Sequence, residues 1–284
     1  MREVVITTDS CCDLTNEIIE KFNIKVLPLN VTLGNDSYLD GVDVFPKDIF
    51  EYVDKTDVLP KTAARSVGDF ITFFKPFVDD GCDVVFIGIG NDLSSTLQNV
   101  AIAAKELPNV YYTDSANLST GISLSLLKAC DLRDEGMSAE DIVKKIDSET
   151  KNMDVSFIID RLDYLYKGGR CSAVSAFGAN LLKLHPCIEV VNGKLGVGKK
   201  YRGNMKDILV KYINDRLSVE GMKFVKKRVF ITHTCVEHPE YVAACVEAAK
   251  ATGIFETVYD TPAGSTIASH CGPNTLGILF ERAE

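Results

Sequence analysis

The amino-acid sequence predicts an α/β protein of two domains: an N-terminal α/β domain with a parallel sheet and a C-terminal α+β domain with a mixed sheet. Three observations predict this. The chain has 284 residues, enough for two hydrophobic cores. Apolar runs rich in β-branched residues alternate with helical patterns through the first half, as in right-handed β-α-β units. The second half contains Asn192-Gly193, a strong hairpin signal, between two strand-like runs. We place the boundary near residue 152, giving domains 1–152 and 153–284.

In the first half, helical patterns follow most of the strand-like runs. Strands are expected at residues 4–8, 25–33, 83–89 and 110–113. Helices are expected at residues 13–22, 68–78, 92–105 and 117–133, and from residues 46 and 138 onward. Asp13 and Ser66 are the expected N-caps of two helices, Pro46 opens a third, and Ser138 begins a capping box. The run at 83–89 is apolar throughout, which favours a parallel strand covered on both faces.

In the second half, hairpins mix with helices. Strands are expected at residues 155–159, 187–191, 194–197, 229–232, 257–259 and in the apolar run 276–280. Helices are expected just after residue 159 and at residues 173–184, 204–217 and 241–251. Residues 264–273 are small and polar, and we interpret them as a loop between the last two strands. Such a mixture predicts an α+β layer that differs from the first half.

Composition and charge exclude several classes of protein. The net charge of −9 argues against a nucleic-acid surface. No apolar run reaches the roughly 18 residues that a membrane span needs. The N-terminus leads directly into a strand without a signal peptide, and the nine cysteines form no disulfide framework, so we expect a cytoplasmic protein with reduced thiols. His233, Cys235 and His238 straddle the end of a strand, so we expect no metal there.

Four polar loops of the first half are expected to follow strands, at the edge where α/β sheets bind ligands. They contain Asp9 and Ser10, residues 61–66, residues 88–96, and Asp114 and Ser115. Because the carboxyl ends of parallel strands share one edge of a sheet, these loops predict a common site. Ser10, Ser95 and Ser115 are secondary candidates in it.

The loop at residues 88–96 has the composition of an anion site. Gly88 and Gly90 allow close backbone approach, and Ser94, Ser95 and Thr96 stand at the start of a helix. Free N–H groups and hydroxyls at a helix N-terminus bind anions. The alternative is plain N-capping by Asp92 or Ser94. Neither a P-loop nor a dinucleotide-binding fingerprint is present.

Two side chains of the second half are further candidates. His270 lies in the glycine- and proline-bounded segment 264–273, and Arg170 follows Gly168-Gly169, which leave its guanidinium free to project. Each also has a simpler interpretation, as a loop histidine and as a solvated arginine. We expect Asp160 or Asp163 to pair with Arg170.

A hydrolase is the alternative that these residues leave open. His270 could act with Asp9 or Asp114, and Cys271 could be a nucleophile. No G-x-S-x-G nucleophile elbow is present, and no spacing supports a triad.

Seven short motifs in order make the chain resemble the DegV family of bacterial fatty-acid-binding proteins. They are T-D-S-x-x-D-L at 8–14, P-L-x-V at 28–31, P-x-T-x-x-x-S at 60–66, L-S-x-T at 93–96, T-D-S at 113–115, K-G-G-R at 167–170 and H-x-G-P at 270–273. The resemblance covers essentially the whole chain. It implies two α/β domains with one long-chain fatty acid in a tunnel between them.

The resemblance also implies a set of roles. The carboxylate is held by Thr62 and Ser94, with His270 and Arg170 beside the head group. From the position of Arg170 after Gly168-Gly169, we expect it at the mouth, facing a partner. From its own apolar residues Phe177, Leu181 and Leu182, the segment 173–184 could line this tunnel, although such helical spacing is also typical of a plain hydrophobic core. The family implies a C14–C18 acid, no other cofactor, and a separate ATP-dependent fatty acid kinase that makes acyl-phosphate for phospholipid synthesis. The protein itself would then be a carrier, not an enzyme.

The sequence departs from the family pattern at three places. Ala63, Ala64 and Arg65 follow Thr62 where the family usually has S-Q-P, Ser95 replaces a glycine, and Cys271 replaces a threonine. These changes bear on the shape of the pocket and on partner contacts. The main alternative is an enzyme acting on a small phosphorylated or carboxylated metabolite, with His270 as nucleophile or base. A carrier or sensor of another apolar ligand is a third.

Overall fold

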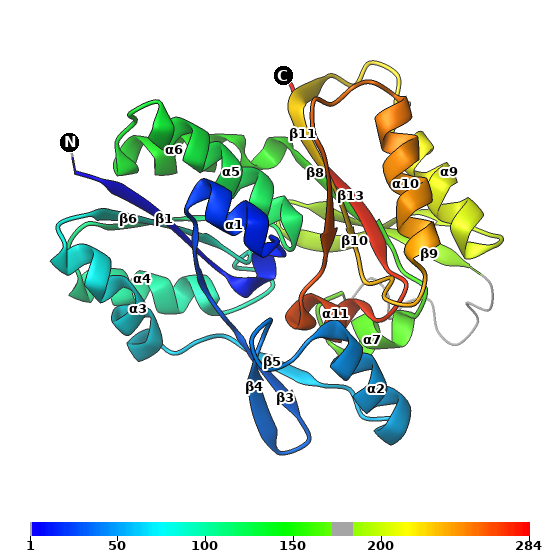
Figure 1. Ribbon diagram of the computed structural model, residues 1–284, viewed down its shortest axis with the longest axis horizontal. Helices are drawn as coiled ribbons and strands as arrows, with labels where there is room; N and C mark the ends of the chain where they lie inside the picture. The colour runs from blue at the N-terminus through cyan, green and yellow to red at the C-terminus, as the bar shows by residue number, and fades with distance from the viewer. Residues whose placement is uncertain (1, 172–183) are drawn as a thin grey trace.

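The computed structural model describes residues 2–171 and 184–284, and it contains a four-stranded, a six-stranded and a three-stranded sheet (Figure 1). Helix α5, Thr120–Asp134, contacts strands of both larger sheets. Every strand of the four-stranded sheet precedes residue 152, and every strand of the six-stranded sheet follows it. A division into two domains at this point stays a prediction.

The four-stranded sheet is parallel throughout, as predicted, with the order β2-β1-β6-β7. Its strands are β1 (Val4–Asp9), β2 (Lys25–Leu27), β6 (Asp83–Gly88) and β7 (Val110–Asp114). The chain leaves β1 toward β2 on one side and later continues through β6 to β7 on the other. The carboxyl ends of β1 and β6 therefore form the topological switch point, where α/β sheets open a crevice for ligands.

The helices of the first half begin largely where their caps predict. They are α1 (Asn16–Phe22), α2 (Pro46–Thr56), α3 (Val67–Asp79), α4 (Thr96–Glu106), α5 and α6 (Ala139–Glu149). Ser66 and Ser138 accept from the N–H groups of Asp69 and Asp141, as expected of N-caps. Asp13 is not the cap of α1. It ends the 3-10 turn η1 (Ser10–Cys12) with a left-handed φ of 52°, and Thr15 caps the helix.

The single strand predicted at residues 25–33 is wrong, because the chain breaks at Pro28. Proline cannot donate to a ladder, so β2 ends at Leu27 and β3 (Asn30–Leu33) joins a different sheet. That antiparallel sheet has the order β4-β3-β5, with β4 at Asp36–Leu39 and β5 at Lys61–Ala63. It was not predicted, although Gly34-Asn35 is a hairpin signal.

The six-stranded sheet is mixed, as predicted, with the order β10-β9-β8-β13-β11-β12. Its strands are β8 (Met153–Ile158), β9 (His185–Val191), β10 (Lys194–Tyr201), β11 (Phe224–His233), β12 (Val258–Pro262) and β13 (Leu276–Arg282). Within this sheet, β11 and β12 are the only described strands that pair in parallel. Asn192 and Gly193 form the predicted two-residue turn, with φ of 50° and 78°.

The described helices of the second half are α7 (Leu162–Lys167), α9 (Met205–Leu217), α10 (Pro239–Ala251) and α11 (Ser265–Cys271). The loop predicted at residues 264–273 is therefore wrong in part, because its centre forms a short helix that carries His270. The helix predicted at residues 173–184 falls, apart from Leu184, outside the described residues.

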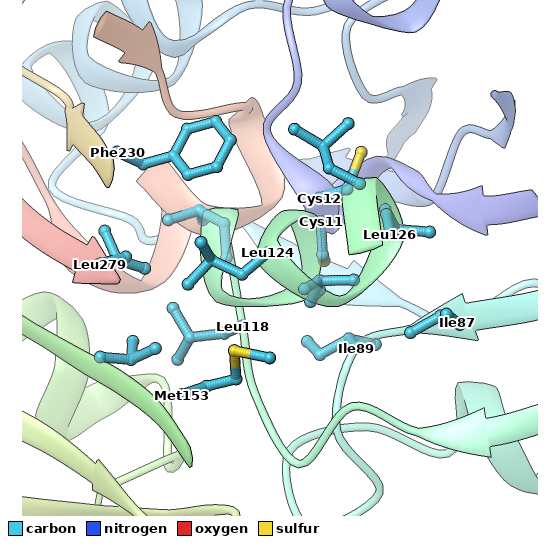
Figure 2. Close-up of a cluster of buried hydrophobic side chains, with 14 of the residues drawn as sticks. Cys11, Cys12, Ile87, Ile89, Leu118, Leu124, Leu126, Met153, Phe230 and Leu279 are labelled. Carbon is cyan, nitrogen blue, oxygen red and sulfur yellow. The ribbon is translucent and has the colours of Figure 1, made fainter. Parts of the chain in front are cut away.

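One hydrophobic cluster joins the two larger sheets around α5 (Figure 2). Ile87 comes from the four-stranded sheet, Leu124 and Leu126 from α5, and Phe230 and Leu279 from the six-stranded sheet. All are buried, so the sheets share this core. Among the described residues, no helix is long and apolar enough to cross a membrane.

Candidate functional site

A cavity of about 330 Å³ opens beside the topological switch point. It lies among the loop that joins β6 to α4, strand β5, helices α7 and α11, and strands β8 and β10. This volume lies within the range of small-molecule sites, near its lower end. Thr62, Ser94, Ser95, Arg170 and His270 all line the cavity, so the structure brings these five predicted residues together.

Thr62 and His270 are hydrogen-bonded to each other across the cavity wall. Thr62 lies on β5, not in a loop, and its Oγ1 is 2.8 Å from His270 Nε2. The other ring nitrogen, Nδ1, is shielded from water and has no hydrogen-bond partner among the described residues. If Nε2 carries the proton, the imidazole donates to Thr62 and leaves the threonine hydroxyl free to donate to a ligand.

His270 is neutral at pH 7. Burial, and then the nearby charge of Arg170, lower the pKa of its imidazole to about 4. The positive charge at the cavity therefore comes from Arg170. No Asp9 or Asp114 carboxylate contacts His270: Asp9 binds the N–H groups of Cys11 and Ile89, and Asp114 binds those of Asn91 and Ala116. The suggested triad is therefore wrong.

Cys271 has the wrong environment for a nucleophile. Its thiol lines the cavity but is buried, and burial raises its pKa to about 12. Within residues 2–171 and 184–284, no group of three His, Cys, Asp or Glu side chains could hold a metal ion.

Ser94 and Ser95 stand at the N-terminus of α4. The Ser94 hydroxyl accepts from Thr96 N at 3.2 Å, so it caps this turn as the alternative interpretation expected, and it also pairs with the Thr96 hydroxyl at 3.0 Å. Ser95 is the N-cap residue but makes no side-chain cap bond. The glycines before them serve the protein's own packing. A Cβ on Gly88 would lie 2.4 Å from Asp9 Oδ2, and one on Gly90 would lie 2.9 Å from Asn117 N.

Arg170 is exposed at the cavity and donates from Nη1 to Gly168 O at 2.7 Å. The predicted acidic partners are wrong, because Asp163 pairs with Arg161 and Asp160 accepts from Asn274. Gly168 lies against the histidine: a Cβ there would be 2.5 Å from His270 Nδ1.

Two of the three secondary candidates, Ser10 and Ser115, lie outside the cavity lining. Ser10 donates to Asp40 and accepts from Leu29 N, while Ser115 donates to Gly88 O and accepts from Asn117 N. Their hydroxyls hold the loops in place.

Sequence reasoning missed two carboxylates that hold α11. Asp13 accepts from Gly264 N at 2.8 Å, and Asp40 accepts from Ser265 N at 2.6 Å and from Thr266 N at 3.2 Å. Both are buried, and burial raises the pKa of Asp13 well above its usual value. Because they lie more than 200 residues before the helix, no local pattern links them to it.

The family model described as "Uncharacterised protein, DegV family" matches residues 3–283. The chain belongs to the DegV family. A DegV domain-containing protein of Clostridium acetobutylicum is 36% identical, with 99% of each chain covered. A Thermotoga maritima protein named as a fatty acid-binding protein is 30% identical over 99% of each chain. A DegV-family structure from Thermus thermophilus, described by its fatty acid binding, has a TM-score of 0.90 and 29% identity with full coverage of both chains.

DegV membership confirms the family predicted from the seven motifs, and the match to the Thermus structure confirms the α/β fold with its parallel and mixed sheets. Thr62, Ser94, Arg170 and His270 share one cavity in this structure. Their roles toward a ligand stay predictions.

Proposed function

We propose that this DegV-family protein binds one C14–C18 fatty acid in the 330 Å³ cavity and presents its carboxylate to a separate ATP-dependent kinase. The observation that carries the proposal is the division of the cavity wall. Hydroxyls, an imidazole and a guanidinium form the polar part of the wall. Leu29, Ile89, Leu118 and Phe157 contribute to its apolar part. An amphipathic ligand with one anionic end matches that division.

The carboxylate would lie between Thr62 and Ser94. The Thr62 hydroxyl, which can accept from His270 Nε2–H, donates to one carboxylate oxygen. The Ser94 hydroxyl donates to the other when its hydrogen turns away from Thr96. The N-terminus of α4 adds a favourable partial positive charge, and bonds to a charged acceptor are the stronger kind. His270 thus orients Thr62 and does not supply the charge.

The acyl chain would extend along the apolar wall. Each buried methylene contributes about 0.8 kcal/mol before the cost of ordering the ligand is subtracted. For a C16 chain this is large enough to hold the lipid through purification. The binding needs no cofactor, because hydroxyl and backbone donors suffice for a carboxylate.

The geometry favours a carrier over an enzyme. His270 is neutral and has no acidic partner among the described residues, and Cys271 has a pKa of about 12. An enzyme acting on a small phosphorylated or carboxylated metabolite, with His270 as nucleophile or base, is the alternative that the experiment must separate.

Mass spectrometry of lipid extracted from the purified, denatured protein tests the proposal. We expect a C14–C18 fatty acid at about one equivalent. The free acid should bind far better than its methyl ester, because the ester lacks the anion that the hydroxyls and the α4 N-terminus favour. An empty protein that does not bind added fatty acid would overturn the proposal. Equal binding of acid and ester would indicate a general apolar carrier.

Delivery of the fatty acid to a kinase is tested separately. The purified protein with ATP should form no acyl-phosphate, and addition of the fatty acid kinase of the same organism should produce it. Turnover of ATP or a metabolite by this chain alone, lost in His270→Ala, would favour the enzyme instead.

A further inference from the structure

Thr266 is a buried polar residue of the cavity wall that the carboxylate scheme does not use. It lies on α11, lines the cavity and is 4% exposed. Its hydroxyl has no hydrogen-bond partner among the described residues, although Ser265 and Ser269 on the same helix donate to Val44 O and Ser265 O. Most buried hydroxyls in proteins have a hydrogen-bond partner, because an unpaired one destabilises the folded state. An unpaired hydroxyl in a cavity wall is therefore a candidate ligand contact.

The helix places Thr266 one turn from His270. Residues four apart share a helix face, with Cβ atoms about 5–6 Å from each other. His270 contacts Thr62 at the proposed carboxylate position. Thr266 therefore lines the cavity a short distance from the proposed carboxylate position, and it would lie beside the first few carbons of a bound acyl chain.

Rotation about χ1 exchanges the hydroxyl and the methyl group of a threonine. Threonine populates two χ1 rotamers in helices, so the exchange is accessible. Because the Thr266 hydroxyl has no bond to lose, turning it toward the cavity costs little. An unsubstituted chain would contact the methyl group, whereas a chain that carries an oxygen substituent there would gain a hydrogen bond.

We infer that Thr266 forms a subsite for a hydroxyl group near the carboxyl end of the acyl chain, so that the cavity takes 3-hydroxy fatty acids as well as unsubstituted ones. The inference rests on the proposed function, because it needs the carboxylate at Thr62 and His270. A valine at this position would leave the ligand hydroxyl buried and unpaired, which disfavours its binding.

The test compares two ligands in two proteins. Dissociation constants of hexadecanoic acid and 3-hydroxyhexadecanoic acid are measured for the delipidated protein and for Thr266→Val, which keeps the side-chain shape. The readout is the ratio of the two constants within each protein. We expect Thr266→Val to shift this ratio against the hydroxy acid by about three- to tenfold, the effect of one hydrogen bond between neutral groups.

Two controls locate the effect. Thr62→Val should weaken both acids and leave their ratio unchanged. The second control compares octadecanoic acid with 12-hydroxyoctadecanoic acid, in which the hydroxyl is far from the head group. Thr266→Val should not change the ratio of their dissociation constants.

Thermal unfolding of the unliganded variant should show no loss of stability, because the hydroxyl removed has no partner. If Thr266→Val does not fold, Thr266→Ala provides the same comparison.

An unchanged ratio in Thr266→Val would overturn the inference, as would an equal loss for both acids, which would instead place the hydroxyl on the carboxylate. Failure of the unmodified protein to bind either acid would contradict the proposed function itself.

Discussion

Asp40 Oδ1 accepts a hydrogen bond from Ser265 N at 2.6 Å, which ties the segment between β4 and α2 to the first turn of α11. The same carboxylate accepts from Thr266 N and from the Ser10 hydroxyl through Oδ2. Since α11 carries His270, the position of the imidazole in the second half depends on a side chain of the first half.

Asp40→Ala should therefore destabilise the fold and loosen the site together. Removing the acceptor leaves two N–H groups at a helix start without their partner, which costs about 2 kcal/mol. We expect a lower melting temperature and weaker fatty acid binding, measured by thermal unfolding and by titration. Asp43→Ala is the matched control. Its exposed carboxylate accepts from Leu39 N in the same loop, and its loss should have a much smaller effect on both readouts. Equal effects of the two variants would contradict the role given to Asp40.

Gly168→Ala should displace His270. The added Cβ would lie 2.5 Å from His270 Nδ1 and 2.8 Å from Tyr164 O, and the backbone oxygen cannot move away freely. We expect a loss of about 1–3 kcal/mol in the free energy of unfolding, as for other overpacked sites, together with weaker ligand retention. Gly68→Ala is the control, because its nearest neighbour is 3.8 Å away and alanine favours the helix there. An unaltered His270 ring signal in the nuclear magnetic resonance spectrum of Gly168→Ala would show that the added Cβ does not displace the imidazole.

The His270 imidazole should titrate with a pKa of about 4 in the unliganded protein. The chain has four histidines, so ring signals followed by nuclear magnetic resonance can be assigned, with His270→Gln identifying this one. The folded pKa lies below the usual 6.5, so between these values the unfolded chain binds a proton that the folded chain does not. The contribution of this group to the free energy of unfolding therefore falls by about 3 kcal/mol as the pH drops from about 6.5 to about 4, and is constant above that window. A pKa of 6 or more would mean that the imidazole is solvated or charged.

Local patterns were enough to predict much of the frame. The apolar run before Gly88 identified β6, Ser66 and Ser138 identified helix starts, and Asn192-Gly193 identified a hairpin. The order of the motifs predicted a single head-group site with Thr62, Ser94, Arg170 and His270. The structure places all four at one cavity.

The features that were missed depend on distant contacts. The small sheet uses strands as short as Lys61–Ala63, too short for a periodic pattern. Helix α11 has only seven residues, begins after a glycine and ends before one, so its sequence resembles a loop. Its N-terminal acceptors, Asp13 and Asp40, lie on other segments. The prediction that Asp163 pairs with Arg170 was wrong, because Asp163 pairs with Arg161, two residues away.

Thr62→Ala and Ser94→Ala should each weaken fatty acid binding by about 1.5–3 kcal/mol, because each removes a hydrogen bond to a charged oxygen. The double variant should purify largely empty while melting as a folded protein, and mass spectrometry of extracted lipid gives the occupancy. Ser115→Ala is the control, since the Ser115 hydroxyl binds Gly88 O and Asn117 N away from the cavity. Full lipid occupancy in the double variant would show that the carboxylate binds elsewhere.

Arg170→Ala should separate delivery from binding. The side chain is exposed at the cavity and donates a hydrogen bond to the carbonyl of Gly168, so removing it leaves no buried charge unpaired. We expect fatty acid affinity to fall by less than about tenfold, because an exposed arginine contributes little when water screens it. Acyl-phosphate formation with the partner kinase should fall much further, since a guanidinium at the mouth can contact the kinase or steady the developing acyl-phosphate.

Arg161→Ala, which removes a nearby guanidinium paired with Asp163, is the matched control and should retain transfer. His270→Ala should weaken ligand retention and transfer together, because it removes the partner of Thr62. Equal losses of binding and transfer in Arg170→Ala would make Arg170 a ligand-binding residue and not a partner-facing one.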